Sequence, residues 1–276
     1  MKCAYNDALS VTFIRHGEYD PSNPTGYHNT GLTMLGTREA RSLHPQSKRD
    51  LNNTVGYSMN NARALGTIAL ALFPKTPDEC VEQHIHKLIS RNIIQILECL
   101  DYLPFIDQEL EDRLGSASVN GTNLAFLVDE SDAYQNETST VFSTYSMMAS
   151  DMAKLLIEQS SAVTENTLQG SSHQQLLVCG REFIYGCFRT KITEKSHGAK
   201  AANSFVSWYG ETIELTDTSR TSSTHIGIQR PSIHNASQPT FRLSDSFGDV
   251  SFSITELNEI IEEQAHNLQN TTGHAV

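Results

Sequence analysis

The chain has 276 residues, 38% of them hydrophobic and 19% charged, which is enough for one large domain with an ordinary core. A formal net charge of −12 argues against broad binding to nucleic acid or anionic membranes, because phosphate backbones require clustered Lys and Arg. The five cysteines contain no CxxC pair, no apolar run reaches the length of a membrane span, and the amino terminus lacks the apolar core of a signal peptide. We therefore expect a cytoplasmic protein that binds neither nucleic acid nor membrane, although a local basic pocket can still hold one phosphate group.

The first candidate for chemistry follows the first apolar run. Val11–Ile14 has the character of a buried strand and leads into Arg15-His16-Gly17. Strands of open α/β sheets deliver ligand-binding residues at their carboxyl ends. Arg15 is a fixed cation suited to phosphate, His16 is a possible nucleophile, and Gly17 lets the backbone turn sharply or approach a ligand closely. Further along, Thr33 can cap a helix.

A second strand and helix bring another cation toward this region. Thr54–Ser58 is a short strand candidate, and Asn60 or Asn61 can cap the helix predicted over Ala62–Phe73. Arg63 falls in the first turn of that helix. The helix dipole mildly opposes a cation there, whereas a bound anion reverses the penalty and meets free N–H groups.

The middle of the chain is less regular. The first half of Cys80–Leu100 has helical periodicity, while Ile93–Leu97 is either strand or helix. An acidic run at 107–112 is typical of a solvated loop, from which one carboxylate can point inward. Residues 116–144 are polar and predict an insertion or lid, and Ser146–Gln159 predicts an amphipathic helix with a methionine-rich core face.

The last part of the chain begins with a second strongly apolar strand candidate, Leu176–Cys179, which ends at Gly180-Arg181. A hairpin is expected around Gly248-Asp249, because short alternating runs flank it. The remaining predictions are a helix over Glu182–Arg189, a loop over Lys191–Ser204, a strand or hairpin over Phe205–Leu215, a linker over Thr216–Ser223 and a final helix over Glu256–His266.

Taken in order, these motifs resemble the histidine phosphatase superfamily. The resemblance is carried by Arg15-His16-Gly17, by the helix start Leu32–Ala40 (LTMLGTREA), by Arg63–Thr67 (RALGT) and by Glu111 four residues before Gly115. It implies an α/β fold: a three-layer α/β/α sandwich with a mostly parallel central sheet, phosphoglycerate mutase-like. It also implies one domain over 1–276, with polar insertions near 116–144 and 191–223.

The resemblance implies a role for each site residue. His16 would be the nucleophile that forms a phosphohistidine, Arg15 and Arg63 would bind the phosphoryl oxygens, and Glu111 would protonate the leaving oxygen. No cofactor or metal is implied, and the ligand would be a phosphorylated small molecule or phosphoprotein. Ser58 departs from the pattern, because it stands one residue too far upstream of Arg63.

The largest departure lies after the second apolar strand. The family has a second pocket histidine there, but Gly180 occupies the position and no neighbouring register supplies a histidine. One hypothesis is a slow or specialised phosphatase in which Arg181 replaces the lost donor. The alternative is a catalytically inactive protein that binds a phosphorylated ligand or a protein partner. Cys179 is interpreted as a buried thiol, and a mutase is the least favoured activity. The substrate and oligomeric state do not follow from the sequence.

Overall fold

The computed structural model divides the chain into two compact units. Unit 1 comprises Met1–Asp101, Val163–Arg181 and Thr216–Ile228, and unit 2 comprises Tyr102–Ala162, Glu182–Leu215 and Gln229–Val276. The residues that the structure describes are 9–18, 30–43, 54–97, 123–129, 144–168, 174–180, 182–215, 223–229, 240–245 and 247–272. The expectation of a single domain stays a prediction.

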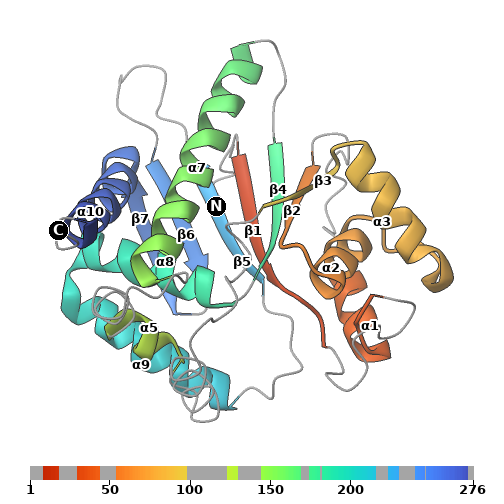
Figure 1. The fold of residues 1–276 in the computed structure, drawn as a ribbon, viewed down its shortest axis with the longest axis horizontal. Coiled ribbons are helices and arrows are strands. Elements are labelled where there is room, and N and C mark those ends of the chain that lie inside the picture. The colour runs from red at the N-terminus through yellow and green to blue at the C-terminus, as the bar shows by residue number, and fades with distance from the viewer. Residues whose placement is uncertain are drawn as a thin grey trace, which may run out of the picture. The chain divides into compact units, whose positions relative to one another are not determined.

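Unit 1 is built on a mostly parallel sheet (Figure 1). Its strands are β1 (Leu9–Arg15), β2 (Thr54–Ser58), β3 (Ile94–Ile96), β4 (Gln174–Gly180) and β5 (Ser223–Gln229). They lie in the order β3-β2-β4-β1-β5. The first four are parallel to one another, and β5 is antiparallel to β1. Ile93–Leu97, for which the sequence left strand and helix open, contains β3. Ser223–Gln229, where only a linker ending at Ser223 was expected, forms a further strand.

The two central strands owe their position to unbroken apolar runs. In β4, Leu176 and Leu177 are 0% and 1% exposed although their side chains point to opposite faces of the sheet. Val11, Phe13 and Ile14 of β1 are also buried. Parallel strands covered on both faces show this continuous hydrophobic pattern instead of alternation. The same runs predicted both strands from the sequence.

Helices flank the sheet of unit 1. They are α1 (Met34–Ser42), α2 (Ala62–Leu72), the 3-10 turn η2 (Asp78–Cys80) and α3 (Val81–Ser90). α2 packs against β2 and β4, α3 packs against β3, and α1 packs against α2. The predicted caps are present: Thr33 Oγ1 accepts a hydrogen bond from Gly36 N at 3.1 Å, and Asn61 Oδ1 accepts one from Ala64 N at 2.8 Å. The expected α/β class with a mostly parallel central sheet flanked by helices is confirmed.

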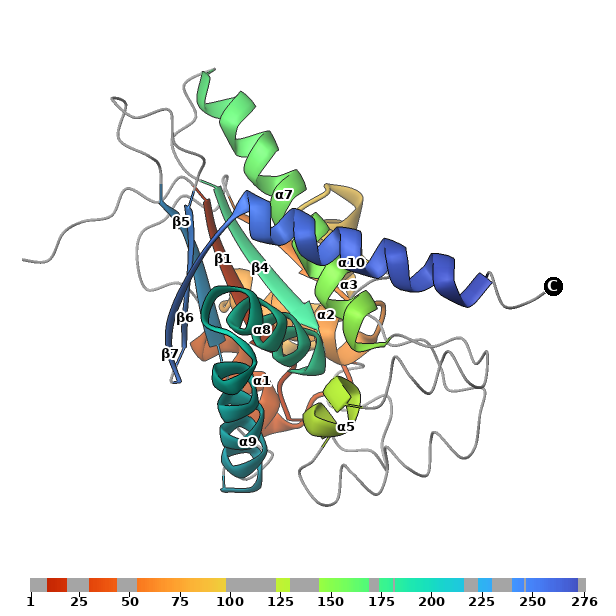
Figure 2. The same cartoon turned by 90° about the vertical axis from the view of Figure 1, so that its left-hand side faces the viewer.

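Unit 2 combines helices with a hairpin (Figure 2). Its elements are α5 (Asn123–Asp129), α7 (which begins in this unit, Tyr145–Leu168), α8 (Glu182–His197), α9 (Ala199–Leu215), β6 (Thr240–Asp245), β7 (Gly248–Ser253) and α10 (Ile254–Thr272). α8 is central, because it contacts α5, α9, α10 and β7. The predicted hairpin is β6–β7, which pair antiparallel, and the chain runs from β7 directly into α10. No helix in the described part of the chain combines the length and apolar character that crossing a bilayer needs.

Two predictions for unit 2 were wrong. Lys191–Ser204 is not a loop and Phe205–Leu215 is not a strand, because α8 and α9 cover both stretches. The loop prediction followed the polar composition, but Ile192 and Phe205 are fully buried on the inner faces of these helices. The true break is a single residue: Gly198 has φ +84°, a conformation that suits glycine at a helix end. In its described part, the expected polar insertion at 191–223 is therefore mainly a helix pair.

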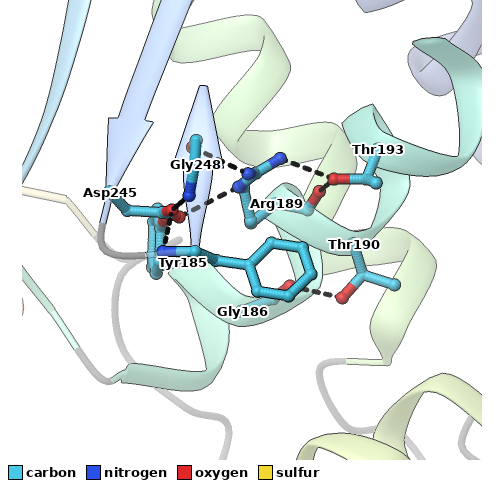
Figure 3. A network of polar contacts seen from close by, with 8 residues as sticks. Tyr185, Gly186, Arg189, Thr190, Thr193, Asp245 and Gly248 are labelled. Carbon is cyan, nitrogen blue, oxygen red and sulfur yellow. Dashed lines mark hydrogen bonds and ion pairs between the residues drawn. The ribbon is translucent and has the colours of Figure 1, made fainter. Parts of the chain in front are cut away.

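A buried arginine ties the hairpin to α8 (Figure 3). Arg189 Nε donates to Asp245 Oδ2 at 2.9 Å, and its two terminal nitrogens donate to Thr193 Oγ1 at 2.6 Å and to Gly248 O at 3.1 Å. The other Asp245 oxygen accepts the backbone N–H groups of Phe247 and Gly248 at 2.9 and 3.0 Å. A buried ion pair is tolerated only when its remaining donors and acceptors are satisfied in this way.

Candidate functional site

Three parallel strands of unit 1 end at one edge of the sheet. Arg15, the last residue of β1, is paired in register with Gly180, the last residue of β4, and Ser58 at the end of β2 is paired with Cys179. His16 follows β1, and Arg63 lies in the first turn of the helix that follows β2. The carboxyl edge is where open α/β sheets bind ligands. The predicted residues Arg15, His16 and Arg63 are thus delivered to the same edge.

We call residues His16–Glu18 the signature loop. Its backbone is fastened to α2 by one hydroxyl group: Gly17 N donates to Thr67 Oγ1 at 2.9 Å, and Thr67 Oγ1 donates to Arg63 O at 2.7 Å. Thr67 is fully buried. This two-bond bridge fixes the distance between the backbone of the loop and the turn of α2 that carries Arg63.

The other side of the loop lies against α1 without intervening side chains. A Cβ atom added to Gly17 would come within 2.6 Å of Gly36 O, and one added to Gly36 would collide with the backbone of Glu18. Each glycine is therefore required by the close approach of two backbones. Thr33 N also donates to Glu18 O at 3.0 Å, so the loop is held by both α1 and α2.

The ring of His16 is oriented by its own neighbour. Nδ1 lies 3.1 Å from Gly17 O, and a carbonyl oxygen can only accept a hydrogen bond. Nδ1 therefore carries the proton in the neutral ring, which leaves the lone pair on Nε2. The side chains of Arg15, His16 and Arg63 are all half-buried. A half-buried imidazole with Nε2 unprotonated is chemically suited to nucleophilic attack.

The register bears on the missing second histidine. Gly180, which is the last residue of β4 and stands at the position of that histidine, is paired with Arg15 at the end of β1. Arg181 lies outside the described residues, as does Glu111. Their proposed roles rest on the sequence alone.

Two other residues near this edge, Ser58 and Cys179, are buried in the core. Ser58 is fully buried and its hydroxyl donates to Met59 O at 2.9 Å, which agrees with its displacement from the family pattern. Cys179 is 0% exposed, and burial raises the pKa of its thiol. Desolvation of this kind disfavours a thiolate nucleophile. The interpretation of Cys179 as a buried thiol is confirmed. Among the described residues, no cluster of His, Cys, Asp and Glu is arranged to hold a metal ion.

Sequence reasoning missed the residues that hold the loop. Thr33, Gly36, Glu39 and Thr67 were all part of matched motifs, but only Thr33 was given a role, that of a helix cap. The motif LTMLGTREA carried the signal, since residues three apart lie next to each other on a helix and can face one partner together. What the sequence could not supply was the identity of that partner, the signature loop.

Comparisons with known proteins add little beyond this geometry. No family model matches the chain, and no curated protein does. Among solved structures, a mycobacterial glucosyl-3-phosphoglycerate phosphatase superposes with a TM-score of 0.47 at 13% identity, covering 85% of this chain and 96% of that one. Mycobacterial hydrolases 1 and 2 both give a TM-score of 0.44, at 13% and 14% identity, covering 86% and 92% of this chain and 97% and 96% of theirs. Similarity at this level decides neither a family nor an activity.

Proposed function

We propose that the chain hydrolyses a phosphate monoester through a phosphohistidine at His16. The single observation that carries the proposal is the contact of 3.1 Å between His16 Nδ1 and Gly17 O. In a neutral ring this contact holds the proton on Nδ1, away from the reacting nitrogen, as a nucleophilic histidine requires.

The proposed reaction has two steps. Nε2 of His16 attacks phosphorus, the bond to the ester oxygen breaks, and the leaving oxygen takes a proton from Glu111. Water, deprotonated by the same carboxylate, then attacks the phosphohistidine, releases inorganic phosphate and restores the lone pair on Nε2. Arg15 and Arg63 neutralise the phosphoryl oxygens, since positioning and charge provide most of the catalysis in phosphoryl transfer.

A second candidate function is binding of a phosphorylated ligand without turnover. Gly180 at the end of β4 favours it, because glycine has no side chain to donate to the transferring group. Loss of one preorganised donor typically costs about 10²–10³ in rate. In the enzyme proposal Arg181 takes over this contact.

A chromogenic phosphate ester separates the two functions. Turnover that disappears in His16→Ala, and persists in the exposed-site control Arg38→Ala, supports the hydrolase. An inactive wild-type protein whose melting temperature still rises with vanadate supports the binder. If neither turnover nor a vanadate shift is found, both candidates fail. In the enzyme case, Arg181→Ala should weaken vanadate binding by about 1–3 kcal/mol, the scale of a charge-assisted hydrogen bond, and unchanged affinity would remove Arg181 from the site.

A further inference from the structure

The peptide group between Gly17 and Glu18 is held at both of its polar ends. Its carbonyl oxygen, Gly17 O, lies 3.1 Å from His16 Nδ1. Its amide nitrogen, Glu18 N, donates to Glu39 Oε2 at 3.4 Å. One peptide plane therefore stands between a carboxylate on α1 and the imidazole at the end of β1. Nothing in the two-step reaction above uses Glu39.

The position of the Glu39 carboxylate follows from the way the first turn of α1 is attached to the signature loop. Thr33 caps α1 and donates its hydroxyl hydrogen to Glu18 Oε2, in addition to the backbone bond from Thr33 N to Glu18 O. Gly36 removes the side chain that would hold the two backbones apart. Glu39 is three residues beyond Gly36 and thus its neighbour on the helix surface. Its side chain is half-buried, so the contact with Glu18 N is only partly exposed to competing water.

We propose that Glu39 is a positioning residue for His16 and acts through the Gly17–Glu18 peptide group. The catalytic meaning of this proposal rests on the proposed function. The relay, by which we mean the chain of hydrogen bonds from Glu39 through the peptide group to His16 Nδ1, concerns only the tautomer of the ring and can be tested without activity. An ionised acceptor on the N–H polarises the amide, and hydrogen bonds in such a chain strengthen one another. The carbonyl then accepts the Nδ1 proton more strongly and turns less freely. The carboxylate thereby selects the Nδ1–H tautomer and directs the lone pair of Nε2 outward.

The tautomer of His16 can be observed without any substrate. Long-range ¹H–¹⁵N correlation spectra of ¹⁵N-histidine-labelled protein distinguish Nδ1–H from Nε2–H rings, and His16→Asn identifies the signal. We expect the Nδ1–H form in the wild type. Glu39→Ala and Glu39→Met, which lack an acceptor, should shift the population toward Nε2–H. Glu39→Gln keeps an acceptor oxygen and should retain most of the Nδ1–H form. Glu79→Ala, which removes an exposed carboxylate of the same unit, is the matched control.

Kinetics provide the second readout. With a chromogenic ester, Glu39→Ala should lower kcat by up to about 10- to 100-fold, the loss typical when the partner of a metal-ligating histidine is removed, with KM unchanged. Glu39→Gln should restore most of kcat. A purely structural role would lower the melting temperature of both variants without changing the tautomer.

The outcomes separate the two proposals. An Nε2–H ring in the wild type, or an unchanged Nδ1–H ring in folded Glu39→Ala or Glu39→Met, overturns the role of Glu39. If both variants unfold, Glu39→Gln takes their place: a weaker, uncharged acceptor should lower the Nδ1–H population relative to the wild type, and an unchanged population would overturn the role of Glu39. A protein with no turnover but with the expected tautomer shift would contradict the proposed hydrolase and leave the relay intact.

Discussion

Arginines differ in environment and role between the two units. In unit 2, Arg189 is 1% exposed, its nitrogens donate to Asp245, Thr193 and Gly248, and its guanidinium lies 5.3 Å and 5.9 Å from the ring centres of Phe205 and Phe247. In unit 1, Arg15 and Arg63 remain half-buried at the carboxyl edge of a parallel sheet. The buried contacts of Arg189 are therefore structural, whereas Arg15 and Arg63 lie at the edge where open α/β sheets bind ligands.

The contrast between Arg189 and the two arginines of unit 1 means that residue type alone does not locate a binding site. Arg189 is buried, and its guanidinium is already surrounded by Asp245, Thr193, Gly248 and two aromatic rings. Chemistry needs a cation that can exchange water for substrate, and burial to 1% excludes this exchange. Exposure, judged together with strand ends, is the more useful criterion.

The largest expected effect on stability follows from replacing Arg189 in unit 2. Arg189→Met should lower the free energy of unfolding by about 3–5 kcal/mol, because it leaves the carboxylate of Asp245 buried without its cation. Arg63→Met should cost much less stability but weaken vanadate binding by about 1–3 kcal/mol. Urea unfolding and vanadate titration of both variants measure the two quantities. Equal losses of stability would erase the proposed distinction.

The next effect sharpens the role of the signature loop. Gly36→Ala forces α1 away from Glu18 and should destabilise the protein by about 1–3 kcal/mol, as overpacking does. Gly198→Ala meets no atom within 4 Å but must adopt φ +84°, which costs about 1–2 kcal/mol. Matched losses of stability with a fall in kcat only for Gly36→Ala would show that the loop, and not stability in general, controls the chemistry.

A smaller effect concerns the pH dependence of stability. Burial, and next the charge of Lys87, lower the pKa of His84, whose ring packs edge-on against Phe73 with the ring centres 5.0 Å apart. The unfolded chain therefore binds the proton first as the pH falls below 6.5. The contribution of the neutral His84 to the free energy of unfolding is therefore fully present above pH 6.5 and is lost as the pH falls below it. In His84→Leu, urea unfolding should show a smaller drop in stability between pH 7.5 and 5.5 than in the wild type, and an identical drop would contradict the assignment.

The smallest effect is expected at the junction of α8 and α10. Desolvation opposes ionisation of Glu263, but hydrogen bonds from Lys195 and Lys191 hold its pKa below the usual value. This contribution is present above the ordinary pKa of 4.5 and is lost as the pH falls. Because the Glu263 side chain is 39% exposed, Glu263→Gln should cost no more than about 1 kcal/mol at pH 7. High salt should remove the difference in urea midpoints, and a difference that survives it would indicate a role in packing.

The elements that the sequence predicted correctly carry one of two signals, an apolar run that is buried in the fold or a polar cap before a helix. β1 and β4 are continuous runs, and the caps Thr33 and Asn61 sit where short polar side chains precede a helix. The helix predicted over Glu182–Arg189 is the first half of α8, but the prediction of a loop from polarity failed over Lys191–Ser204, because polar side chains there concealed the buried Ile192.

For the candidate site, the sequence supplied the residues and the structure supplied their connections. Arg15, His16 and Arg63 were identified from motifs. The bridge through Thr67 and the carboxylate of Glu39 depend on which backbones touch, and contacts between distant segments leave no trace in a single sequence. Glu111 and Arg181 remain predictions from the sequence.

Each unit contains a buried cysteine whose rate of labelling by a thiol reagent can report when that unit opens. Cys179 in β4 and Cys187 in α8 are both 0% exposed, whereas Cys80 is exposed. With Cys3, Cys80 and Cys99 replaced by serine, a thiol reagent can reach Cys179 only when the unit 1 sheet opens and Cys187 only when unit 2 does. Two labelling rates, read by mass spectrometry during native-state exchange, would then time the opening of each half of the molecule separately.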